Sequence, residues 1–178
     1  MLTRFVLLIA LVATTQGAPA TQDSPENLIL KRAAAASRKA APEWRFISAI
    51  VNAPGPLMDE QLGVAAGSWL KSSDESTGSW YRSLDESTQI HVTIYTIATA
   101  EAADRWLNRR AHGEVAKGWT VETYDFADGA TMATYPDPRG FTQYETAIRQ
   151  GRFLVTLSGR SKETIERFAN IVITAISN

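Results

Sequence analysis

A short loop carries the side chains best suited to binding chemistry. Residues 135–141 have the sequence Tyr-Pro-Asp-Pro-Arg-Gly-Phe. The two prolines restrict the backbone, which lowers the entropy lost when a ligand is held. An acid and a base lie between aromatic residues, a composition suited to recognition by a loop. We therefore predict that Tyr135, Asp137 and Arg139 bind a ligand. The alternative is that the loop is only a stiff connection between strands.

A histidine on a predicted strand over residues 89–98 is the second candidate. Strand periodicity places His91 and Tyr95 on the face opposite an apolar stripe of Ile90, Val92 and Ile94. An imidazole, with an ordinary pKa of about 6.5, can act as acid, base or ligand. We include His91 and Tyr95 among the candidate binding residues. The alternative is an ordinary sheet residue that faces solvent or lies under a helix.

Other chemical patterns have simpler explanations. Ser68 and Lys71 match the Ser-x-x-Lys pattern of penicillin-recognising enzymes, but the companion motifs of those enzymes are absent. In the predicted strand their side chains point to opposite faces. The tetrapeptide Asp-Glu-Ser-Thr occurs at 74–77 and again at 85–88. Its four acids could collect a hard cation, although this composition is also typical of turns.

The usual catalytic signatures are missing from the sequence. It contains no cysteine, and its two histidines, His91 and His112, have no metal-binding spacing. It also lacks a Gly-x-Ser-x-Gly elbow, a His-Glu-x-x-His motif and a phosphate-binding glycine loop. We predict no catalytic residue, no metal ligand and no cofactor. His112 is expected at a helix end, where a cation is favourable.

The first twenty residues have the organisation of a secretory signal peptide. A basic residue, Arg4, precedes an apolar run over 5–13, and the segment ends in Ala18-Pro19-Ala20. The apolar run is shorter than the roughly 20 residues that span a bilayer. We therefore expect a periplasmic or secreted protein that keeps no integral membrane anchor after cleavage. The alternatives are cleavage at Gly17 or Ala18, and an uncleaved anchor.

Composition restricts the class of partner. Loss of residues 1–20 removes one of 18 basic residues and none of 19 acidic residues, so 17 − 19 leaves a net charge of −2. This balance offers no electrostatic attraction for nucleic acid. Without cysteines, the exported chain must be stabilised by its apolar core instead of disulfides. The expected partner is an unidentified protein or small molecule.

The elements that position the candidate residues are clearest after residue 89. A strand at 89–98 precedes a helix at 100–111 that Gly113 is expected to end. Strands follow at 119–126, 130–135, 141–149 and 152–158, and an apolar stripe predicts a final helix over 162–176. Earlier, we predict strands at 68–71 and 78–83 and a short helix at 59–66. Residues 43–52 fit either a strand or a short helix.

Strands in hairpins interrupted by two helices favour the α+β class. We expect a single domain over 43–178, with a twisted antiparallel sheet of about five to seven strands. The main helices, 100–111 and 162–176, are expected to cover one face. Residues 21–42 are expected to form a leader or marginal helix. The element order also resembles the small αβ sandwich of the extrinsic photosystem subunits, which is the alternative architecture.

These observations favour an exported, non-enzymatic binding or accessory domain of unknown ligand. The alternative is a hydrolase-like enzyme whose site is assembled from scattered residues around His91. That alternative requires His91, Tyr95, Asp137 and Arg139 to come within hydrogen-bonding reach of one another.

Overall fold

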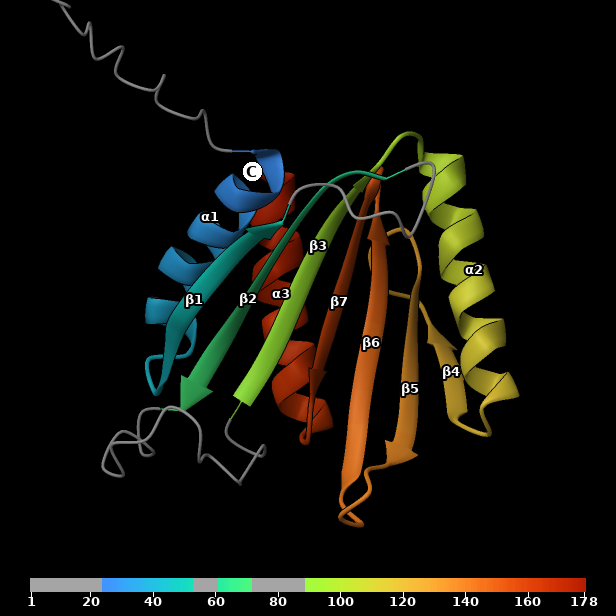
Figure 1. The fold of residues 1–178 in the computed structure, drawn as a ribbon. Coiled ribbons are helices and arrows are strands. Elements are labelled where there is room, and N and C mark those ends of the chain that lie inside the picture. Colours follow the sequence, from blue (N-terminus) through green and yellow to red (C-terminus); the bar gives the residue numbers. More distant parts are fainter. Residues whose placement is uncertain (1–23, 53–60, 72–88) are drawn as a thin grey trace, which may run out of the picture.

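The protein is built on one seven-stranded sheet with three helices packed against it (Figure 1). The computed structural model describes residues 24–52, 61–71 and 89–178. Within them every pair of neighbouring strands is antiparallel, which confirms the predicted α+β class. The strand order is β1-β2-β3-β7-β6-β5-β4. The elements are α1 (Pro25–Ala40), β1 (Trp44–Asn52), β2 (Gln61–Lys71), β3 (Gln89–Ile97), α2 (Ala100–Ala116), β4 (Thr120–Tyr124), β5 (Ala130–Pro136), β6 (Thr142–Gln150), β7 (Phe153–Gly159) and α3 (Lys162–Ser177).

The helices lie on both faces of the sheet, whereas the sequence predicted that 100–111 and 162–176 share one face. Adjacent residues of β7 show the difference: Val155 belongs to the core cluster of α1 and α3, and Leu154 to that of α2. Because neighbouring strand residues point to opposite faces, the two clusters lie on opposite sides. The central strands are therefore apolar on both faces. Alternation along a strand cannot say which helix covers which side.

Helix α3 forms where the apolar stripe predicted it. Ser161 caps its first turn by accepting a hydrogen bond from the Thr164 amide at 3.2 Å. Ile165, Phe168 and Val172 are completely buried against the sheet. Phe168 also contacts the ring of Trp69, with centroids 4.8 Å apart. The helix thus covers one face of the central strands and closes the larger core.

Helix α1 packs into this core, although the sequence predicted a leader or marginal helix outside the domain. Ser24 caps its first turn, and Pro25 occupies the first helical position, where its missing N–H costs nothing. Leu30 is fully buried. The Trp69 indole N–H donates to Ser37 Oγ at 3.0 Å across the helix–sheet boundary. Ile29, Leu30 and Ala33 therefore attach the helix to the sheet.

Three local predictions differ from the structure or are settled by it. Residues 61–66 of the predicted helix belong to β2. The prediction was wrong because small residues there conceal the strand alternation. The ambiguous 43–52 segment forms β1. Helix α2 continues past Gly113 to Ala116, and the buried Glu114 accepts a hydrogen bond from Arg110 at 2.8 Å. The predicted strand at 78–83 lies outside the described residues.

Candidate functional site

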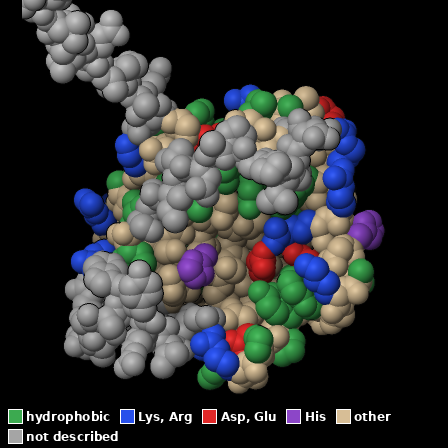
Figure 2. Space-filling model, viewed as in Figure 1, with side chains coloured by type: hydrophobic (Ala, Val, Ile, Leu, Met, Phe, Trp, Pro, Cys, Tyr) green, Lys and Arg blue, Asp and Glu red, His purple; other side chains and the backbone are tan. Residues whose placement is uncertain are grey.

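Four of the five candidate binding residues line one open depression of about 350 Å³. It lies on the face of the sheet that carries α2 (Figure 2), where a histidine is exposed and acidic and basic side chains gather. The strand register assembles it, because His91 of β3 is paired with Ser158 of β7, and Tyr135 of β5 with Gln143 of β6. The full lining is Gln89, His91, Tyr135, Asp137, Pro138, Arg139, Gln143, Ser158 and Gly159.

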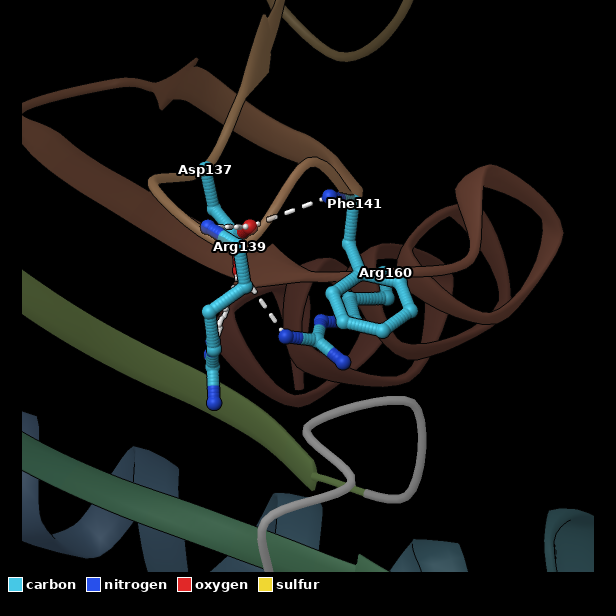
Figure 3. A network of polar contacts seen from close by, with 4 residues as sticks. All are labelled: Asp137, Arg139, Phe141 and Arg160. Atoms are coloured by element: carbon cyan, nitrogen blue, oxygen red, sulfur yellow. Dashed lines mark hydrogen bonds and ion pairs between the residues drawn. The ribbon is translucent and has the colours of Figure 1, made fainter.

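Asp137 holds the loop between β5 and β6 in shape (Figure 3). Its Oδ1 atom accepts hydrogen bonds from the backbone amides of Arg139 at 2.8 Å and Phe141 at 3.0 Å. Its own amide donates to the Phe141 carbonyl at 2.7 Å, and Gly140 completes the turn with a φ of +82°. Glycine adopts this left-handed conformation without steric penalty. The loop backbone is consequently fixed around one carboxylate.

The other carboxylate oxygen joins two arginines. Asp137 Oδ2 lies 2.8 Å from Nη2 of Arg160 and 3.1 Å from Nη2 of Arg139. Arg160 comes from the junction of β7 and α3, and the ring centroid of Phe141 lies 4.0 Å from its guanidinium carbon. Such a cation–π contact adds to the ion pair. The cluster therefore ties the β5–β6 loop to the last strand.

These contacts keep Asp137 ionised. Burial by itself raises the pKa of Asp137. Hydrogen bonds from the Phe141 and Arg139 amides, and then from the Arg160 and Arg139 guanidiniums, lower this pKa by more than burial raises it. The resulting pKa is about 2. A carboxylate held in this form at neutral pH neither donates a proton nor readily accepts one. Asp137 therefore holds the loop backbone in place and balances part of the charge of Arg139 and Arg160.

His91 has a partner on the neighbouring strand. Its Nδ1 atom lies 2.9 Å from Ser68 Oγ, and the two residues face each other in the β2–β3 register. His91 is exposed, so its ring is accessible from outside. Which of the two atoms donates depends on the imidazole tautomer. Ser68 and Lys71, three positions apart on β2, point to opposite faces of the strand as predicted.

The fifth candidate, Tyr95, does not join the depression. Its ring packs against Trp106 of α2, with centroids 5.8 Å apart, in the smaller core cluster. The convergence that the hydrolase alternative required of His91, Tyr95, Asp137 and Arg139 is therefore incomplete. His112 lies exposed within α2, at some distance from the helix end where it was expected.

Arg160 is the main contributor that sequence reasoning missed. It follows a strand and precedes the helix cap Ser161, a position where an arginine is ordinarily exposed. Only the register of β7 against β6 brings it to Asp137, 23 residues earlier. Ser68 was missed as a partner of His91 because only the register of β2 against β3 brings the two residues together. Gln89, Gln143 and Ser158 carry no distinguishing local pattern.

The possible cation site on the two Asp-Glu-Ser-Thr segments lies outside the described residues, because both segments fall within 72–88. Among the described residues, no group of three or more His, Asp or Glu side chains is placed to hold a metal ion. None of the described helices is long and apolar enough to cross a membrane.

No protein-family model matches this chain. Comparison with curated proteins also gives no match. Among solved structures, the chain is similar to the crystal structure of a GTP binding regulator from Thermotoga maritima, at 12% sequence identity and a TM-score of 0.48. The similarity covers 83% of this chain and 86% of that chain.

Proposed function

We propose that this chain is an exported, non-enzymatic binding or accessory domain, and that the depression around His91 and Arg139 is its binding surface. The observation that supports this best is the state of Asp137. It is the single carboxylate among the described lining residues, and it is bonded to Arg139 and Arg160. The depression thus offers donors and a fixed shape, without a proton-exchanging acid.

The export part of the proposal rests on the N-terminal sequence. Residues 1–20 have the basic, apolar and small-residue order of a signal peptide. Mass spectrometry of the protein from the envelope or medium of its own cells tests this directly. We expect an N-terminus at Thr21, or at Ala18 or Pro19 if cleavage follows Gly17 or Ala18. A chain retained in the cytoplasm with residues 1–20 intact would contradict export.

The hydrolase-like alternative has one specific observation in its favour, the 2.9 Å contact between Ser68 Oγ and His91 Nδ1. In a nucleophilic site the imidazole takes the serine proton and a third group orients the ring. Asp137 does not take that orienting role here, because both of its oxygens are bonded to residues of its own cluster. The described contact is that of two residues facing each other in the register of β2 and β3.

Hydrolysis of p-nitrophenyl acetate and p-nitrophenyl phosphate separates the two functions. We expect wild type, Ser68→Ala and His91→Ala to give the same slow, non-saturating rates. A saturable wild-type rate that falls about 100-fold or more in either variant would show catalysis by this pair, since general-base contributions are of that size. Thr174→Ala, a change on α3, serves as the matched control.

A further inference from the structure

A groove on the other face of the sheet differs in character from the depression around His91. It lies between the first turns of α1 and the end of α3, which pack side by side on that face (Figure 1). Its volume is about 520 Å³, within the range of small-molecule sites, about 300–1,000 Å³. We call it the α1–α3 groove. The described residues that line it are Ser24, Pro25, Leu28, Ile29, Arg32, Phe153 and Ile176.

The floor of the α1–α3 groove is continuous with the larger core. Ile29 is 4% exposed, and Phe153 and Ile176 are partly buried against that core. Leu28, by contrast, is 40% exposed and is one of the few large apolar side chains that the described residues leave at the surface. An exposed apolar wall beside an apolar floor indicates a place where an apolar group binds.

Arg32 is the single charged side chain among the described lining residues. It is exposed, and the residues three and four positions away on either side of it along α1 are all apolar. Among the described residues, no ion pair joins Arg32 to an acid or to the C-terminal carboxylate of Asn178 at the end of α3. Its guanidinium can therefore receive a carboxylate through two parallel hydrogen bonds.

The lining residues of α1 form a row with the charge at one end. Pro25, Leu28 and Arg32 follow one another at intervals of three and four residues, which places them on one face of the helix. The row is about 10 Å long, since each helical residue rises about 1.5 Å. An elongated apolar row that ends in a cation matches an alkyl chain that ends in a carboxylate.

From this juxtaposition we infer that the α1–α3 groove binds a medium-chain fatty acid, with its carboxylate on Arg32 and its alkyl chain along Leu28 and Phe153. The inference goes beyond the proposed function, because the groove lies on the other face of the sheet and uses none of the residues around His91. Arg32 selects for charge, and the apolar row selects for chain length.

The test is a titration of the ¹⁵N-labelled 178-residue chain, followed by NMR, with hexanoate, octanoate and decanoate below their micellar concentrations. We expect the fatty acids to shift amides of 24–32, 153 and 176. The affinity should rise about two- to fourfold for each added methylene, as the burial of one CH₂ group implies. Octanol shares the chain of octanoate without its charge and should bind about tenfold more weakly, since a charged hydrogen bond is lost.

Variants locate the binding. Arg32→Gln should reduce octanoate affinity about tenfold and abolish the preference for octanoate over octanol. Arg38→Gln removes another exposed arginine of α1 and should leave the affinity unchanged. Leu28→Gln should reduce the affinity about threefold or more. Val115→Gln, which removes an exposed apolar side chain of α2, is its matched control. All four side chains are exposed, so circular dichroism should show that each variant remains folded.

Three results would overturn the inference. Equal affinities for octanoate and octanol would exclude the carboxylate contact, and an affinity independent of chain length would exclude the apolar row. Shifts that Arg32→Gln and Leu28→Gln leave unchanged would place the binding elsewhere. Binding to phosphatidylglycerol vesicles without any shift by octanoate would indicate a membrane surface instead of a fatty acid, and would likewise overturn it. Turnover of the p-nitrophenyl substrates that depends on His91 would contradict the proposed function alone.

Discussion

Asp137 Oδ2 lies 2.8 Å from Nη2 of Arg160, and only 6% and 5% of the two side chains are exposed. This ion pair joins the β5–β6 loop to the start of α3. A buried carboxylate is tolerated when charged partners and hydrogen bonds compensate it, as they do here. The shape of the candidate site and the stability of this corner of the fold therefore depend on the same carboxylate.

The first prediction concerns acid. The pKa of Asp137 falls from an ordinary 3.8 to about 2 in the folded chain. Because the folded value is lower, ionisation stabilises the fold fully above pH 4, and this contribution is lost as the pH falls towards 2. Between pH 4 and pH 2, urea unfolding should show wild type losing stability more steeply than Asp137→Asn. Parallel pH profiles for the two chains would contradict the assignment.

The second prediction concerns the attachment of α1. Ser37 Oγ accepts a hydrogen bond from the buried Trp69 indole N–H and donates to the Ala34 carbonyl at 2.9 Å. Ser37→Ala leaves the indole N–H without its acceptor, which should lower the free energy of unfolding by about 1–3 kcal/mol. Ser177→Ala, at the exposed end of α3, should change it by less than about 0.5 kcal/mol. Equal effects of the two substitutions would show that α1 contributes little to the fold.

Much of the fold can be predicted from local pattern. The stripe of α3 and the alternation in β3 are short-range signals, and each element formed where its signal lay. The face that each helix covers was not predictable, because β7 is apolar on both sides. Residues 61–66 were misassigned since Gly63, Ala65 and Ala66 give little contrast between faces.

The site shows the same limit. Asp137 and Arg139 are two residues apart, so loop composition alone identified them. Arg160 and Ser68 meet their partners, each 23 positions away in the sequence, only because the strands pair. Tyr95 was included because it shares a strand face with His91. That face passes under α2 at Tyr95, since α2 covers one end of β3 and leaves His91 exposed.

The third prediction concerns the absence of a side chain at residue 63. A Cβ atom there would overlap the carboxylate of Glu26, which is buried in the first turn of α1 and accepts a hydrogen bond from Thr96. The carboxylate is buried and bonded to Thr96, so moving it aside breaks that hydrogen bond, and Gly63→Ala should destabilise the fold by about 1–3 kcal/mol. In a Glu26→Ala background the same change should cost much less, as measured by a double-mutant cycle in urea.

Gly113 provides the matched control. It lies within α2, and a Cβ atom there would meet nothing within 4 Å. Gly113→Ala should therefore stabilise the fold by about 0.5–1 kcal/mol through helix propensity. Destabilisation by both glycine substitutions to the same extent would contradict the contact with Glu26.

The final prediction separates the two arginines that share Asp137. Arg160 is buried beneath Phe141, and its loss leaves a buried carboxylate with one guanidinium fewer, so Arg160→Gln should clearly lower Tm. Arg139 is largely exposed, and exposed ion pairs contribute about 0–1 kcal/mol, so Arg139→Gln should leave Tm almost unchanged. Thermal unfolding followed by circular dichroism measures both. If Arg139→Gln lowered Tm as much as Arg160→Gln, then Arg139 would be part of the structural clamp, and its exposure would no longer support a role in contacting ligand.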